Sequence, residues 1–184
     1  MGYSVGVFCG SSPDIAPHYL RLAAGVGTAI AERRWTLVSG GEHVSMMGAV
    51  AVAARAGGGR TVGVVSRNLL HKADRDADEL VITESMSARK AELLARSDAL
   101  LVLPGGVGTC DEFFEVWTAR MVGLHAKPIV VLDVDGFYTG LLAWLGDAHD
   151  HGFVRSSSLA AVTSARTVAQ ALDACAGAPS SHAA

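Results

Sequence analysis

A buried-type strand that runs into a glycine-rich turn carries the strongest chemical signal in this chain. Residues 101–112 read LVLPGGVGTCDE. The glycines let the backbone approach an anion closely, the free N–H groups of the following helix point at that anion, and Thr109 adds a hydroxyl. The turn lacks the Gly-Lys-Ser/Thr ending of a nucleoside triphosphatase. The segment therefore predicts a site for a simple phosphate, formed by Gly105, Gly106, Val107, Gly108 and Thr109.

Two carboxylates, Asp111 and Glu112, follow this turn and are expected in the first turn of the helix that begins near Thr109. Favourable placement against the helix dipole explains one acid there, and Glu112 three residues after Thr109 also matches a capping box. If a phosphorylated sugar occupies the turn, a carboxylate one turn away can stabilise positive charge on the sugar or activate a water. The pattern then indicates glycosidic-bond chemistry.

A second cluster, MSARK at residues 86–90, opens the helix expected after the fourth strand. Basic residues oppose the dipole at a helix start, which favours an external anion as their partner. The fork of Arg89 can bind phosphate or hold a carboxylate ionised, whereas the alternative is a solvated pair with Lys90. In a parallel sheet both clusters lie at the same carboxyl edge.

Short β-branched runs alternate with segments of helical period, a pattern that predicts an α/β sandwich in which crossover helices join mainly parallel strands. Strands are expected at 5–9, 35–38, 61–65, 80–83, 100–103, 128–133 and 161–163. Helices are expected from residue 17 and at 46–56, 85–96, 109–122, 138–149 and 167–175. Residues 67–78 form a surface loop with at most one helical turn.

Composition narrows the function classes. The 184 residues are 50% hydrophobic, which predicts one core-bearing domain over 1–175 and a disordered tail over 176–184. The formal charge of −3 has no basic run for a nucleic acid, and no apolar run approaches the ~20 residues of a membrane span. No secretion signal is visible, and three widely separated cysteines form neither a disulfide framework nor a paired metal site. We expect a cytoplasmic protein.

Taken together, PGGVGT with Glu112 and the cluster of Met86, Arg89 and Lys90 resemble the PGGxGTxxE and MxxRK motifs of the Lonely Guy (LOG) family. The likeness extends from about Val5 to Phe153. LOG proteins are cytokinin riboside 5′-monophosphate phosphoribohydrolases, historically misannotated as lysine decarboxylases. The resemblance implies a three-layer Rossmann-like fold, a homodimer with sites near the subunit interface, and cleavage of an adenosine-type 5′-monophosphate to free base and ribose 5-phosphate.

When the functional residues of the family are matched by position, the resemblance implies that Arg89 and Glu112 are the catalytic pair and that residues 105–109 form the phosphate loop. It requires no metal and no redox cofactor. Residues matching ligand-contacting or nucleotide-binding segments of the family are Ser11, Gly40, Gly41, Met86, Lys90 and Thr118.

The chain departs from the family pattern on the side of the base. Where LOG proteins usually read Tyr-Gly-Gly-Gly, residues 39–42 read SGGE, so Glu42 places a carboxylate where a glycine lets a group pass. We expect this carboxylate to repel phosphate or to narrow the pocket. The loop after the third strand is shorter than usual and offers Lys-Ala-Asp at 72–74, and Met121 replaces a common glutamine.

Three other functions compete with this interpretation. A lysine decarboxylase needs a Schiff-base lysine, and Lys72, Lys90 and Lys127 lack such a setting. A nicotinamide oxidoreductase would carry its glycine fingerprint on the first turn, which reads CGSS. The strongest rival is a non-catalytic carrier of a nucleotide-like cofactor such as molybdenum cofactor, because related folds bind it through the same turn.

Overall fold

A computed structural model describes residues 2–177, and its framework is a seven-stranded sheet in the order β4-β3-β2-β1-β5-β6-β7. Every neighbouring pair of strands is parallel, which confirms the predicted α/β class. The strands are β1 (Ser4–Phe8), β2 (Thr36–Ser39), β3 (Thr61–Ser66), β4 (Glu79–Thr83), β5 (Ala99–Val102), β6 (Ile129–Leu132) and β7 (Val162–Ala165).

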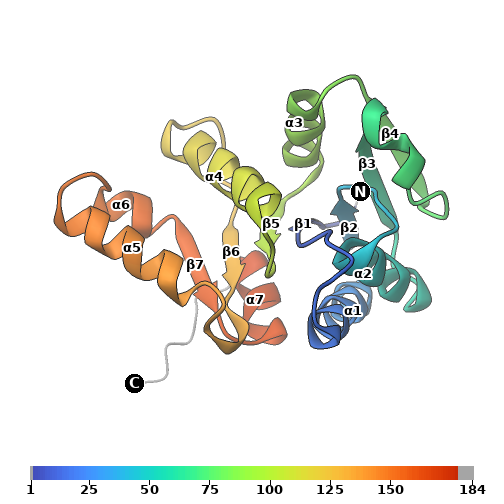
Figure 1. The fold of residues 1–184 in the computed structure, drawn as a ribbon, viewed down its shortest axis with the longest axis horizontal. Coiled ribbons are helices and arrows are strands. Elements are labelled where there is room, and N and C mark those ends of the chain that lie inside the picture. Colours follow the sequence, from blue (N-terminus) through green and yellow to red (C-terminus); the bar gives the residue numbers. More distant parts are fainter. Residues whose placement is uncertain (1, 178–184) are drawn as a thin grey trace.

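Helices cover both faces of the sheet and make three layers (Figure 1). One face carries α1 (Pro17–Glu32), α2 (Ser45–Ala56) and α7 (Val168–Cys175). The other carries α3 (Met86–Arg96), α4 (Val107–Met121), α5 (Thr139–Asp150) and the short α6 (Ser156–Leu159). The loop after β3 contains the 3₁₀ helix Arg67–Lys72, whose six residues exceed the single turn expected there, and a second 3₁₀ helix, Val134–Gly136, follows β6.

The middle of the sheet is apolar on both faces, as fully buried parallel strands require. All four residues of β5 are buried, and β5 lies between β1 and β6, so the expected interior position is confirmed. Leu101 packs in the layer of α1, α2 and α7, whereas Leu100 packs with Phe113 and Trp117 of α4. This rigid centre holds the turn that leaves β5.

The start of α4 corrects one prediction. The helix begins at Val107 rather than Thr109, because extended Gly106 is the residue that precedes it. Thr109 is therefore the third residue of the helix, and no capping box forms with Glu112. Asp111 and Glu112 therefore lie in the second turn, two residues farther from the helix start than expected. At α3, by contrast, Ser85 caps the helix as predicted, its Oγ accepting from the Ala88 N–H at 3.1 Å.

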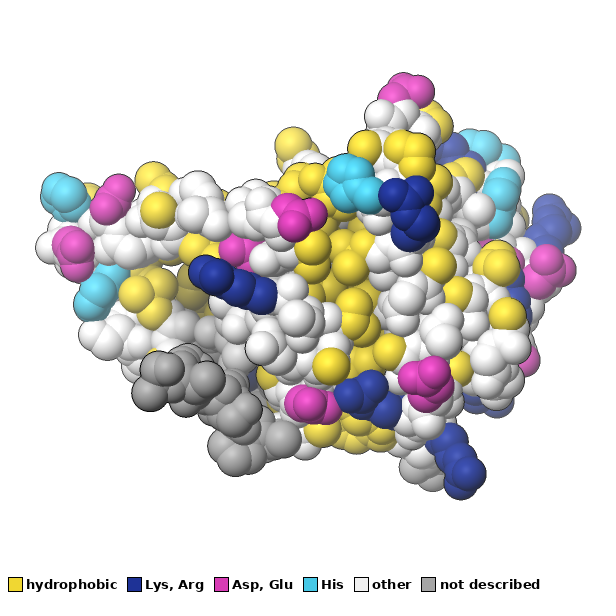
Figure 2. Space-filling model, turned by 90° about the horizontal axis from the view of Figure 1, so that it is seen from below, with side chains coloured by type: hydrophobic (Ala, Val, Ile, Leu, Met, Phe, Trp, Pro, Cys, Tyr) yellow, Lys and Arg dark blue, Asp and Glu magenta, His cyan; other side chains and the backbone are white. Residues whose placement is uncertain are grey.

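Surface charge is mixed in sign. On the face shown in Figure 2, the described Lys and Arg side chains are interspersed with Asp and Glu rather than gathered in one patch. No helix within residues 2–177 has the length and apolar content to cross a membrane. The predicted tail, 176–184, lies outside the described residues from 178 onward.

Candidate functional site

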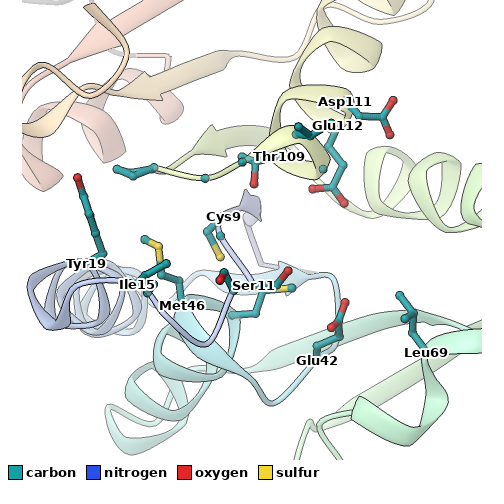
Figure 3. A pocket seen from close by; sticks show the side chains of 18 of the residues that line it. Cys9, Ser11, Ile15, Tyr19, Glu42, Met46, Leu69, Thr109, Asp111 and Glu112 are labelled. Carbon is teal, nitrogen blue, oxygen red and sulfur yellow. The ribbon is translucent and has the colours of Figure 1, made fainter.

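A cavity of about 560 Å³ opens at the carboxyl edge of the sheet, where the turns after β1, β2 and β5 meet (Figure 3). In α/β sheets this edge is where ligands bind. Ser11, Met86, Arg89, Glu112 and the whole stretch 105–109 line the cavity, so the structure brings most of the predicted residues together. Its other lining residues are Cys9, Gly10, Ser12, Ile15, Tyr19, Glu42, Met46, Met47, Leu69, Pro104, Asp111 and Phe137.

Arg89 is the buried cation of this cavity, with a side chain only 5% exposed. Its Nε donates to the Val64 carbonyl at 3.0 Å, Nη2 to the Gly40 carbonyl at 3.2 Å, and Nη1 to Glu112 Oε1 at 3.0 Å. Two fixed carbonyls therefore orient the guanidinium, and the third contact joins α3 to α4. A planar fork with fixed donors can make these contacts, and an ammonium group cannot reproduce them.

Gly40 lies beside the cavity, and the place of its missing side chain is taken by Arg89. A Cβ at this position would lie 1.9 Å from Arg89 Nη2 and 2.8 Å from Met47 Sδ. Gly41 adopts a φ of +70°, which favours glycine, and packs against the backbone of Gly63. Neither glycine lines the cavity, so both act on the site by letting Arg89 and the turn after β2 pack closely.

Gly40→Ala is expected to displace the guanidinium, because the new methyl group and Nη2 cannot share the same space. The Arg89–Glu112 contact then lengthens, and we expect the activity proposed below to fall by roughly 10–100-fold, in line with the cost of misplacing a reacting group. Gly25→Ala is the matched control, since a Cβ there meets nothing within 4 Å. Steady-state kinetics of both variants, with melting temperatures to verify folding, test this; wild-type activity in Gly40→Ala would contradict it.

Glu112 is a carboxylate whose ionisation is finely balanced. Burial raises its pKa to about 7, although the positive charge and the hydrogen bond of Arg89 both act in the opposite direction. In Figure 3 the Glu112 carboxylate points into the cavity, whereas that of Asp111 points away from it. A carboxyl group poised near neutral pH and held by a cation is typical of acid–base or charge-stabilising roles.

The glycine-rich turn is held from both sides. The Gly10 N–H donates to the Pro104 carbonyl at 3.0 Å, and the Tyr138 hydroxyl donates to the Leu103 carbonyl at 2.7 Å. A Cβ on Gly105 would lie 2.1 Å from Thr109 Oγ1, so this glycine is required for packing. The first N–H groups of α4 have no acceptor within the helix, and Val107, Gly108 and Thr109, which carry them, line the cavity. This arrangement suits a bound phosphate.

Within a single chain, two of the predicted ligand-contacting residues, Lys90 and Thr118, lie outside the cavity. Lys90 is neighbour to Arg89 in sequence but points to α4, where it pairs with Asp111 at 2.9 Å and with Glu115. Hydrogen bonds to these carboxylates raise the pKa of Lys90. Thr118 is exposed on α4, and neither residue is part of the cavity lining.

Sequence reasoning missed the apolar wall of the cavity. Ile15, Tyr19 and Phe137 come from segments more than 100 residues apart, and no local pattern connects them. It also missed Tyr138, whose hydroxyl supports the turn, although an aromatic residue after a buried strand is a weak signal.

Burial raises the pKa of the Cys9 thiol, so this lining cysteine is held neutral. Within the described residues, no group of three or more His, Cys, Asp or Glu is arranged to hold a metal ion.

The fold and the cavity define a Rossmann-like α/β protein with its site at the carboxyl edge of the sheet. The profile of a family described as "Possible lysine decarboxylase" matches residues 47–175. The chain is 52% identical over 176 residues to a cytokinin riboside 5′-monophosphate phosphoribohydrolase of Mycobacterium tuberculosis, covering 95% of this chain and 94% of that one. An Arabidopsis thaliana protein of the same description is 38% identical over 86% of this chain and 74% of its own length. The chain belongs to the LOG family.

A solved structure shares the fold. The molybdenum cofactor carrier protein of Chlamydomonas reinhardtii superposes with a TM-score of 0.75 at 25% identity, covering 96% of this chain and 98% of the carrier. The predicted Rossmann-like architecture is therefore confirmed, and a molybdenum cofactor carrier protein shares this scaffold.

Proposed function

We propose that this protein is a phosphoribohydrolase that cleaves the N-glycosidic bond of an adenosine-type 5′-monophosphate, with prenylated cytokinin nucleotides as its preferred substrates. The observation that carries this proposal is the buried Arg89–Glu112 pair beside a glycine-rich helix start. Relatives over nearly the full chain are named for this reaction. The phosphate binds to residues 105–109 and the first N–H groups of α4, and the apolar wall of Ile15, Tyr19 and Phe137 contacts the base or its substituent.

The reaction needs a negative charge beside the sugar. As the bond from C1′ to the base nitrogen breaks, its electron pair leaves with the base and positive charge develops on the ribose. Ionised Glu112 stabilises that charge and orients the water whose oxygen bonds to C1′, while the water's proton passes to the departing base. Arg89 favours the ionised form of Glu112 and fixes the position of its carboxylate. The products are free base and ribose 5-phosphate.

The direct test is incubation of purified protein with AMP and with isopentenyladenosine 5′-monophosphate, followed by chromatography of the free base. Release of base, with the prenylated nucleotide preferred, is the expected result. The rival is the non-catalytic carrier, which the Chlamydomonas neighbour favours. A carrier has no need of a poised carboxylate beside the sugar, and tight binding of either nucleotide without release would support it.

Activity is expected to rise with pH through about 7. The ionised form of Glu112 is the active one and its pKa is raised to about 7, so an increasing fraction of the enzyme is active above neutral pH. The pH profile of kcat/KM reports the pKa of Glu112 in the free enzyme. The pH profile of kcat should have its midpoint at the same pH or higher, because the negative charge of the bound phosphate disfavours ionisation of the nearby carboxyl group. The substrate phosphate titrates near pH ~6. A midpoint at 6, or activity that falls between pH 6 and 8, would contradict this assignment.

We also propose a homodimer in the cytoplasm. Met121, Val122 and Leu124, at and beyond the end of α4, are 51–77% exposed, and such apolar surface suits a second copy of the chain. Lys90 and Thr118 lie outside the cavity of one chain, so contacts from them to a ligand require a second protomer. The three free cysteines support a reducing compartment. Light scattering after gel filtration measures the assembly, and a monomer at micromolar concentration would contradict it.

A further inference from the structure

Glu42 is a buried carboxylate without a hydrogen-bond donor among residues 2–177. Its side chain is 7% exposed and lines the cavity. The nearest cation, Arg89 Nη2, lies 3.9 Å from Oε1 and donates to the Gly40 carbonyl instead. Arg89 therefore supplies charge pairing to Glu42 but no hydrogen bond, and a carboxylate largely withdrawn from water gains from further donors. No oxygen of Glu42 is sealed from solvent without a partner, and the side chain lines the cavity, so its accepting oxygens are open to hydrogen-bond donors of a ligand bound there.

The backbone around Glu42 is fixed, so the carboxylate does not depend on a mobile loop for its position. Glu42 forms an antiparallel bridge with Ala73. On either side of it, the Asp74 N–H donates to the Gly41 carbonyl at 2.7 Å and the His43 N–H to the Lys72 carbonyl at 3.0 Å. The turn after β2 and the loop after β3 thus hold each other, and the backbone that carries the Glu42 side chain is fixed.

The place of Glu42 in the cavity selects which part of a nucleotide it meets. In Figure 3 it lies on the wall that follows β2, across the cavity from Thr109 and the glycine-rich turn. A phosphate at that turn is kept away from the carboxylate, so the donor belongs to the remainder of the molecule. The Glu112 carboxylate points into the space between the two walls. The proposed reaction requires this carboxylate beside the sugar, so the ribose belongs in that space.

Adjacent sugar hydroxyls are the donors that a carboxylate binds best in this setting. Two oxygens of one carboxylate can accept from both hydroxyls, and in dinucleotide-binding α/β folds an acidic residue binds the ribose 2′-hydroxyl. We propose that Glu42 is a specificity-determining residue that accepts hydrogen bonds from the 2′- and 3′-hydroxyls of the substrate ribose. This inference rests on the proposed phosphoribohydrolase function and adds a contact at a position where the family pattern has glycine.

The test compares kcat/KM for AMP with that for its 2′-deoxy and 3′-deoxy analogues in wild type, Glu42→Ala and Glu42→Gln. The expected result is that the ratio of AMP to the deoxy analogues falls by about tenfold or more in Glu42→Ala, the usual effect of a hydrogen bond to a charged group. Glu42→Gln should keep part of the ratio, because its amide oxygen still accepts. The intrinsic difference in lability between the nucleotides cancels, since each variant is compared with wild type.

Asp111→Asn is the matched control, because it removes another lining carboxylate that is paired with Lys90 and points away from the cavity. Its ratio should match that of wild type. Calorimetry with ribose 5-phosphate and 2-deoxyribose 5-phosphate gives a second measurement that needs no turnover. The inference is supported if wild type binds ribose 5-phosphate more tightly than 2-deoxyribose 5-phosphate and Glu42→Ala does not. If no nucleotide is hydrolysed, that result refutes the proposed function alone. Ratios within twofold of wild type in both measurements, for a folded Glu42→Ala variant, overturn it.

Discussion

Replacing Glu112 with Gln is expected to reduce hydrolysis of AMP by about 10³-fold or more. The amide is nearly isosteric and its oxygen can still accept from Arg89, so the cavity keeps its shape. It carries no negative charge, however, and the positive charge that develops on the ribose loses its stabilisation, which in enzyme sites of this kind is worth orders of magnitude in rate. The loss should appear in kcat, because the carboxylate contributes to the transition state rather than to the binding of the ground state.

Affinity is the measurement that separates a catalytic role from a structural one. Calorimetry should show that Glu112→Gln binds AMP as tightly as wild type or more tightly, because a negative charge near the phosphate has been removed. Glu115→Gln is the control: this residue lies on the same helix and pairs with Lys90, and it does not line the cavity. Its turnover should stay within about threefold of wild type. More than a tenth of wild-type activity in Glu112→Gln would refute the assigned role.

Replacing Arg89 is the second large effect. Arg89→Ala removes the donors of two buried carbonyls, Val64 and Gly40, and the partner of Glu112. Each unsatisfied group costs roughly 1–3 kcal/mol, so the free energy of unfolding should fall as well. We expect activity to drop by about 10³-fold, and Arg89→Lys to recover only part of it, because an ammonium keeps the charge without the fixed fork.

The pH profile shows whether Arg89 acts through Glu112. Arg89 lowers the pKa of Glu112 by its charge and hydrogen bond, so its removal takes away the main opposition to burial and the pKa rises above about 7. The residual activity of Arg89→Ala should therefore have its midpoint at higher pH than that of wild type, and Arg89→Lys should lie between them. Arg96→Ala, at the far end of α3, is the control and should leave the midpoint unchanged. An unshifted profile in Arg89→Ala would limit Arg89 to a structural role.

The chain by itself determined the fold class and the chemical centre of the site. Alternating strand and helix periods predicted the parallel sheet, because residues buried on both faces of a strand leave a continuous apolar run such as 99–102. The glycine-rich turn and its flanking carboxylate are also local signals, since they depend on backbone conformation and on residues within one or two helical turns. These features can be predicted from the sequence without knowledge of any long-range contact.

Tertiary structure decided what each side chain faces. Arg89 and Lys90 are adjacent in sequence, yet the ~100° between successive helical residues turns one into the cavity and the other onto α4. Gly40 gained its role from the guanidinium that fills the space beside it, and the start of α4 moved two residues because Gly106 is extended. The Glu42 carboxylate, an unexplained departure in the sequence, lies in the cavity across from the phosphate turn. Packing between segments dozens of residues apart sets such directions, and local sequence patterns do not encode them.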